Sequence, residues 1–235
     1  FTSVVALDRF GADDVASAFD HFSSLAAEAI VVIAPVDSLA EAVASQGASV
    51  PVVAVSGGRT FGRGVSVVHA DQRGGARALA EHLMSLGHQD IACVAGPQEW
   101  FEARERVAGW REAMDEAGLS KRAPLVGSWE ARWGYVAGQA LVEDGLPDAV
   151  MCANDEVAVG LLRAFTEAGV SVPGDVSVAG FDDVPMAAYA GPGLTTVRQD
   201  FADLGRCALE AVSRALDGEA VDTFVRPTRL VVRGS

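Results

Sequence analysis

Apolar residues along this chain follow two alternating spacings. Short apolar runs with the length of a buried strand separate longer stretches in which apolar residues recur every third or fourth position, as on one face of a helix. The predicted strands are residues 2–7, 30–34, 50–55, 65–69, 91–95, 125–126, 150–153, 176–181 and 228–232. The predicted helices are residues 13–28, 38–46, 71–86, 103–117 and 156–168, with two more around 135–141 and 204–216. This alternation predicts an α/β fold in which parallel sheets are covered by helices on both faces.

The alternation starts afresh at Gln89, just after a helix that is predicted to end at Gly87. A second run of strands and helices within one chain predicts a second lobe of similar design. Residues 194–200 are expected to form a segment that connects this lobe to the amphipathic helix around 204–216.

Polar side chains stand at the ends of two predicted strands of the second lobe. The apolar run at 149–153 stops at Asn154 and Asp155, and the run at 176–181 stops at Asp182 and Asp183. In an open parallel sheet, ligands bind in the crevice beyond the carboxyl ends of the strands, so these residues are candidate ligand contacts. Asp155 has a second interpretation, which we favour, as the N-cap of the helix that follows.

Arg106 and Trp129 extend this candidate site. Arg104 and Arg106 diverge on a helix, so only one of them can face the crevice, and Arg106 shares its helix face with Trp110. An arginine fork suits vicinal hydroxyls or a carboxylate, and the flat face of Trp129 can stack on the C–H face of a sugar ring. Trp129 could instead be a core residue. With Asp182 as acceptor and Asn154 as donor and acceptor, this set suits a sugar, although other polyols or nucleosides fit it too.

Composition and charge narrow the function. The formal net charge is −14, with 18 Lys and Arg against 32 Asp and Glu, which argues against this chain holding a nucleic-acid backbone by itself. No apolar run reaches the ~18 residues of a membrane span and no basic leader precedes one, which favours the cytosol. Cys93, Cys152 and Cys207 lie in apolar surroundings and are expected to be buried free thiols.

Catalytic motifs are missing from the sequence. It has no Gly-x-Ser-x-Gly elbow, no His-Glu-x-x-His and no cysteine with a plausible partner histidine. Asp182 and Asp183 are adjacent at a strand end and point apart, so they do not form an acid and base pair. We therefore expect a binding protein without a cofactor or metal, and not an enzyme.

Six segments together resemble the LacI/GalR family of bacterial transcription regulators, specifically their effector-binding core. The segments are EHLMSLGH (81–88), IACVAGP (91–97), ARERVAGW (103–110), ANDEVAVG (153–160), GFDD (180–183) and LTTVRQDF (194–201). Each is modest alone, but they occur in the family's order and cover essentially the whole chain. The resemblance implies a two-lobed fold like that of type I periplasmic sugar-binding proteins. It divides the chain into a first lobe of residues 1–87 plus 200–226 and a second lobe of residues 88–199 plus 227–235.

The resemblance also implies the ligand-binding residues, by their places in these motifs. Those that line the effector pocket are Arg106, Trp129, Asn154 and Asp182. Trp100 and Phe101 are expected at the pocket rim, and Gln199, with Phe201, in the crossover between the lobes.

The function implied by the resemblance is ligand sensing by a cytoplasmic repressor. A sugar or glycoside bound between the lobes would alter operator affinity through a homodimer, with DNA bound by a headpiece that is not present in this chain and with no part for a membrane. The alternatives are an exported sugar-binding protein of a transport system, which shares the fold, and an enzyme acting on sugars, which we favour least.

The start of the chain departs from the family pattern. Family members carry a helix-turn-helix headpiece, a hinge helix and a first strand and helix before the segment that resembles residues 2–7 here. A sheet without that strand would expose unpaired edges. We therefore expect the sequence to be incomplete relative to the natural protein.

Overall fold

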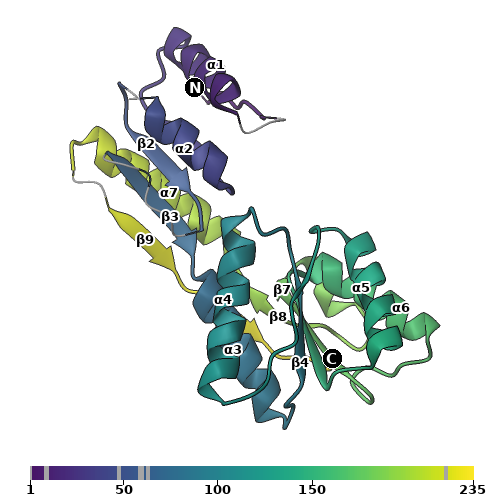
Figure 1. The fold of residues 1–235 in the computed structure, drawn as a ribbon. Coiled ribbons are helices and arrows are strands. Elements are labelled where there is room, and N and C mark those ends of the chain that lie inside the picture. Colours follow the sequence, from purple (N-terminus) through teal and green to yellow (C-terminus); the bar gives the residue numbers. More distant parts are fainter. Residues whose placement is uncertain (1, 8–10, 47–48, 58–60, 62–63, 220–221) are drawn as a thin grey trace. The chain divides into compact units, whose positions relative to one another are not determined.

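The structure is a computed structural model that describes residues 2–7, 11–46, 49–57, 61 and 64–219, together with 222–235. The chain forms two compact units (Figure 1). The first unit contains residues 1–71, 99–102 and 200–226, and the second contains residues 72–98, 103–199 and 227–235.

The first unit is built on a four-stranded parallel sheet with the order β1-β2-β3-β9. Its strands are β1 (Ile30–Ile33), β2 (Val52–Val55), β3 (Val65–Ala70) and β9 (Thr223–Arg226). Its helices are α1 (Ala12–Ser24), α2 (Asp37–Ser45) and α7 (Phe201–Leu216).

The two faces of this sheet are covered by different helices because side chains alternate along a strand. Val52 and Ala54 of β2 pack in one apolar cluster with Leu39 of α2. Val53, between them, packs in another cluster with Leu204 of α7. The sheet therefore has helices on both faces, as a buried parallel sheet requires.

The second unit contains a six-stranded sheet with the order β10-β8-β7-β6-β4-β5. Its strands are β4 (Ile91–Ala95), β5 (Leu125–Val126), β6 (Ala149–Cys152), β7 (Ser177–Asp182), β8 (Thr195–Arg198) and β10 (Arg229–Val231). Its helices are α3 (Gln72–Ser85), α4 (Phe101–Glu116, from residue 103 on), α5 (Ala131–Asp144) and α6 (Asp155–Glu167), with the 3-10 helix η1 (Pro185–Ala188). Among the strands described, only β10 runs antiparallel to its neighbour, and it lies at an edge.

The core of the second unit consists of two apolar layers, one on each face of the sheet. One layer joins Leu79 of α3 and Trp110 of α4 to alternate residues of the central strands, and the other joins Leu161 and Phe165 of α6 to the remaining ones. The predicted α/β class, with parallel sheets between helices, is confirmed.

Three local predictions differ from the structure. Residues 2–7 form no strand, and Val4 is 85% exposed, because a strand needs a hydrogen-bonded neighbour that the described residues do not provide. Residues 195–198 form strand β8 within the sheet rather than a plain connection. Residues 223–226 form β9, which was not predicted.

The predicted lobe boundary at residue 87 also differs from the division in the structure. Helix α3 belongs to the second unit, because Leu79 and Leu83 pack against Ile91 and the other residues of that core. The first unit of the structure therefore ends at Asp71 before α3, and residues 99–102 return to it. The remaining boundaries of the two units fall after Gln199 and after Arg226.

Within the described part of the chain, no helix combines the length and the apolar character needed to cross a membrane.

Helices α5 and α6 touch backbone to backbone through two glycines. A Cβ atom added at Gly160 would lie 1.7 Å from the carbonyl oxygen of Ala131, and one at Gly134 would lie 1.8 Å from that of Val157. A side chain at either position would force the helices apart.

We expect Gly160→Ala to lower the free energy of unfolding by about 2 kcal/mol, because the backbone of α5 must move although alanine favours helix. Urea unfolding followed by circular dichroism measures this. Gly205→Ala is the matched control, since its Cβ would meet nothing within 4 Å in helix α7. Equal stability of the two variants would contradict the packing argument.

Candidate functional site

Arg106, in the second turn of α4, is the centre of a polar cluster in the second unit. Its side chain is only 6% exposed. Nε donates to Oε1 of Gln72 at 2.8 Å, Nη2 donates to Oδ1 of Asp182 at 3.2 Å, and Nη1 donates to the carbonyl oxygen of Ala153. The guanidinium carbon lies 3.9 Å from the centroid of the Phe181 ring. A buried cation is thus surrounded by acceptors and by the face of an aromatic ring.

Two glutamines close this cluster into a ring of hydrogen bonds. Gln72 donates through Nε2 to Oε1 of Gln199 at 2.6 Å, and Gln199 donates through Nε2 to Oδ1 of Asp182 at 2.6 Å. Within this ring Arg106 donates two hydrogen bonds, to Gln72 and Asp182, and Asp182 accepts two, from Arg106 and Gln199. Four side chains from separate elements therefore fix one another, and we call them the polar ring (Arg106, Gln72, Gln199 and Asp182).

The topology of the sheet explains why these residues meet. Asp182 is the last residue of β7, Gln199 follows β8, and Ala153 follows β6. These strands are parallel neighbours, so their carboxyl ends lie at one edge. Gln72 is the first residue of α3 and reaches the same edge. This is the place where open parallel sheets bind ligands.

Asn154 and Trp129 lie beside the polar ring. Asn154 is the N-cap of α6, because its Oδ1 accepts from the backbone N–H of Val157 at 2.8 Å, and its Nδ2 donates to the carbonyl oxygen of Trp129 at 3.1 Å. The ring of Trp129 is half-buried, and its centroid lies 5.4 Å from the guanidinium carbon of Arg106. Trp129 is therefore next to the site and outside the apolar clusters of the core.

The predicted N-cap role of Asp155 is wrong. Asn154 occupies the cap, and Asp155 is the fully buried first residue of the helix. Its Oδ1 accepts from the hydroxyl of Thr196 at 2.6 Å and its Oδ2 accepts from the backbone N–H of Val184 at 2.8 Å. The sequence does not distinguish the two neighbours, because both can cap a helix.

Trp100 and Phe101 belong to the first unit. Phe101 is 4% exposed and packs in the apolar cluster of that unit, with Trp100 partly buried against it. The backbone N–H of Phe101 donates to the carbonyl oxygen of Pro35 at 2.9 Å. Contact of these two residues with a ligand stays a prediction, and the burial of Phe101 leaves little of its ring for one.

Gln72 was not predicted as a site residue, although the sequence contains a signal for it. It is a polar residue in the first turn of a helix that directly follows a strand, the same setting that drew attention to Asn154. Its distance of 127 residues from Gln199 along the chain hides their contact.

Burial and charge act differently on the three carboxyl groups near this edge. Burial raises the pKa of Asp182, against the opposite effect of Arg106 and Gln199. Burial also raises the pKa of Asp155 to about 6, although Thr196 and Val184 donate to it. Burial opposes ionisation of Asp183 as well, yet its ion pairs with Arg233 and Arg198 hold its pKa below the usual value.

Within the described ranges, no three or more His, Cys, Asp or Glu side chains group as metal ligands would. Cys93, Cys152 and Cys207 are buried and free, as expected, and burial raises the pKa of Cys93 to about 12.

A largely parallel sheet between helices, with polar residues at the carboxyl ends of its strands, is the architecture of the periplasmic-binding-protein type. Residues 80–235 match the family described as periplasmic binding protein-like domain. The chain is 38% identical over 161 residues to the lactose operon repressor of Escherichia coli (strain K12), covering 68% of this chain and 45% of that protein. The chain thus spans about half the length of such curated relatives.

Solved structures of the same family are similar to nearly the whole chain. The lac repressor bound to ONPG in the repressed state superposes with a TM-score of 0.88 at 31% identity, covering 98% of this chain and 71% of that one. A complex of the transcriptional regulator CelR with cellobiose gives a TM-score of 0.84 at 29% identity, covering 95% and 70%. A LacI family regulator from Enterococcus faecium with bound ribose gives a TM-score of 0.81 at 26% identity, covering 94% of this chain and 84% of that one. The chain belongs to the LacI family of transcriptional regulators and corresponds to their effector-binding core.

The raised pKa of Asp155 predicts how stability changes with pH. Its folded pKa of about 6 lies above the unfolded value near 3.8, so the folded state binds the proton more tightly and acidification through pH 6 is stabilising. Between pH 8 and pH 5 the wild type should gain about 1.5 kcal/mol of unfolding free energy relative to Asp155→Asn. Urea unfolding of both proteins at the two pH values measures the difference. A difference that does not change with pH would show that Asp155 does not titrate there.

Proposed function

We propose that this chain is the ligand-sensing core of a LacI-type DNA-binding repressor, and that it binds a sugar or glycoside at the polar ring. The observation that supports this most is the ring itself, in which a buried arginine, a carboxylate and two amides are fixed at the strand ends. Preorganised donors and acceptors of this kind recognise hydroxyl groups without ordering flexible side chains first.

Each member of the site has a role in this proposal. Both hydrogen bonds to the Asp182 carboxylate within the polar ring end at Oδ1, so its Oδ2 is placed to accept from a ligand hydroxyl. The half-buried Trp129 supplies a flat apolar face for the C–H side of a sugar ring. The solved relatives carry ONPG, cellobiose and ribose, which supports a carbohydrate ligand here.

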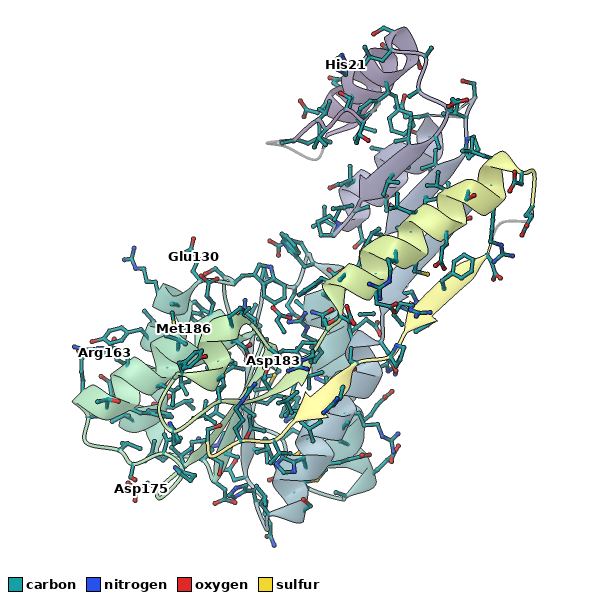
Figure 2. The ribbon with its side chains drawn as sticks, turned by 180° about the vertical axis from the view of Figure 1, so that it is seen from behind. His21, Glu130, Arg163, Asp175, Asp183 and Met186 are labelled. Carbon is teal, nitrogen blue, oxygen red and sulfur yellow. The ribbon has the colours of Figure 1, made fainter. Side chains whose placement is uncertain are left out.

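The proposal extends to the whole protein through its relatives. A homodimer would place two DNA-binding headpieces, which lie outside this chain, about one turn of DNA apart on the operator. One of the similar structures is a lac repressor dimer bound to operator. Met186 and Tyr189, which are 63% and 85% exposed near η1, give the second unit apolar surface that a second copy could cover. Figure 2 labels Met186 in this unit.

The ligand would act through its different affinity for two arrangements of the dimer. Coupling of this kind amounts to about 1–3 kcal/mol in typical allosteric proteins. The negative charge of the chain, −14, agrees with DNA contact by another segment. We place such a regulator in the cytoplasm. The repressor relatives favour this function over an exported binding protein of a transport system.

We expect Asp182→Ala to weaken sugar binding by about 10-fold to 100-fold, because Arg106 loses its counterion and the ligand loses an acceptor. A thermal-shift screen of wild type with cellobiose, ribose, ONPG and other mono- and disaccharides identifies the ligand. Isothermal titration of that ligand into the variant then measures the loss.

Asp175→Ala is the matched control for this experiment. Asp175 is an exposed carboxylate of the same unit that accepts from the backbone N–H of Ser171 at 2.8 Å, and Figure 2 shows it well away from Asp183. The Asp175→Ala variant should bind the sugar as wild type does. A screen in which no carbohydrate raises the melting temperature would refute the sugar class, and wild-type affinity of Asp182→Ala would refute the site.

A further inference from the structure

Asp155 is hydrogen-bonded to the loop that begins at Asp182, the last residue of β7. The side chain is fully buried, and its two oxygens are used by different elements: Oδ1 by Thr196 in β8 and Oδ2 by the backbone N–H of Val184. Val184 is two residues beyond Asp182. One carboxylate thus joins the start of α6, strand β8 and the loop after β7.

The backbone of this loop is strained. Asp182 has a φ of 106° and Asp183 a φ of 54°, and neither residue is a glycine. Left-handed conformations of this kind persist only where the surroundings hold them, and they gather at functional sites. Something must therefore keep the backbone of the Asp182 loop in place.

Two sets of contacts hold this loop. Asp183, whose side chain is 4% exposed, forms ion pairs with Arg233 at 2.7 Å and with Arg198. Asp155 holds the other end by accepting the N–H of Val184. The strained Asp182 lies before both sets of contacts, and its carboxylate faces Arg106 and Gln199.

We propose that Asp155 is a positioning residue, which fixes the backbone after Asp182 through the N–H of Val184 and so keeps the Asp182 carboxylate at the polar ring. That Asp155 thereby supports ligand binding rests on the function proposed above. The capping of α6 does not need Asp155, because Asn154 supplies it. The side chain of Asp155 has room only because residue 180 is glycine, whose added Cβ would lie 2.2 Å from Oδ1.

The charges around Asp155 agree with this role. Burial disfavours the ionisation of Asp155 most, and the carboxylates of Asp182 and Asp183 add to this effect. Three nearby arginines are paired with those two aspartates: Arg106 with Asp182, and Arg198 and Arg233 with Asp183. A buried carboxylate without its own counterion is costly to the fold. A cost of this kind is typical of residues kept for function.

Hydrogen–deuterium exchange on the protein without ligand tests the proposal independently of any sugar. Asp155→Ala should reduce the protection of the Val184 amide by about tenfold or more. Asp155→Asn should stay within about threefold of wild type near pH 7, because its amide can accept from Val184 and donate to the hydroxyl of Thr196. The Val170 amide, which donates to the carbonyl oxygen of Phe165 at 2.9 Å, reports whether the unit remains folded.

A crystal structure of Asp155→Ala gives the second readout. We expect the φ of Asp182 to leave the left-handed region and its carboxylate to leave Arg106 and Gln199. Asp175→Ala, which removes an acceptor for the N–H of Ser171 in another loop, should keep both contacts and the Val184 protection. If Asp182 keeps its place in Asp155→Ala and Val184 remains protected, the proposal is overturned.

If Asp155→Ala does not fold, Thr196→Val tests the same proposal. This change keeps the volume but removes the hydroxyl that donates to Oδ1, so the carboxylate is less firmly held. Val184 should then lose protection by about threefold, less than in Asp155→Ala. Unchanged protection of Val184 in Thr196→Val would contradict the proposal in that case.

Discussion

The buried guanidinium of Arg106 is the constraint on which the rest of the site depends. A cation taken out of water is stable only when acceptors surround it, because the loss of its hydration costs several kcal/mol. Here the acceptors are the carboxylate of Asp182, the amide oxygen of Gln72 and the carbonyl oxygen of Ala153, while Phe181 covers one face. Three elements that begin or end at one sheet edge must therefore stay in register with helix α4.

The same demand makes the site rigid before any ligand arrives. Gln199 cannot turn without leaving Asp182 or Gln72, and Asp182 cannot move without leaving Arg106. Asp155 and the ion pairs of Asp183 in turn fix the strained backbone at residues 182–184. Rigid donors and acceptors lose little entropy on binding, so the arrangement suits recognition of a small polar molecule.

The sequence predicts most of the fold and much of this site, and the misses have physical reasons. The apolar pattern located the helices and central strands, because the helices are buried on one face and strands β4, β6 and β7 are buried along nearly their whole length. It failed for residues 2–7, since a strand also depends on a partner that periodicity cannot reveal. Asn154, Arg106 and Asp182 could be found because they follow apolar runs or share a helix face. Gln72 and the true role of Asp155 depend on contacts with residues 127 and 41 positions away in the chain, which no local pattern encodes.

The ion pairs of the candidate site determine whether a charged or an uncharged ligand fits it better. Arg106 is paired with Asp182, and Asp183 is paired with Arg198 and Arg233. The remaining carboxyl group, Asp155, is buried, and its two oxygens already accept hydrogen bonds from Thr196 and Val184. A charged ligand would have to break one of these pairs or bring its own counterion, and either step is expensive in a buried setting. An uncharged molecule rich in hydroxyl groups can instead accept from amide and guanidinium N–H groups and donate to carboxylate oxygens while every ion pair remains intact.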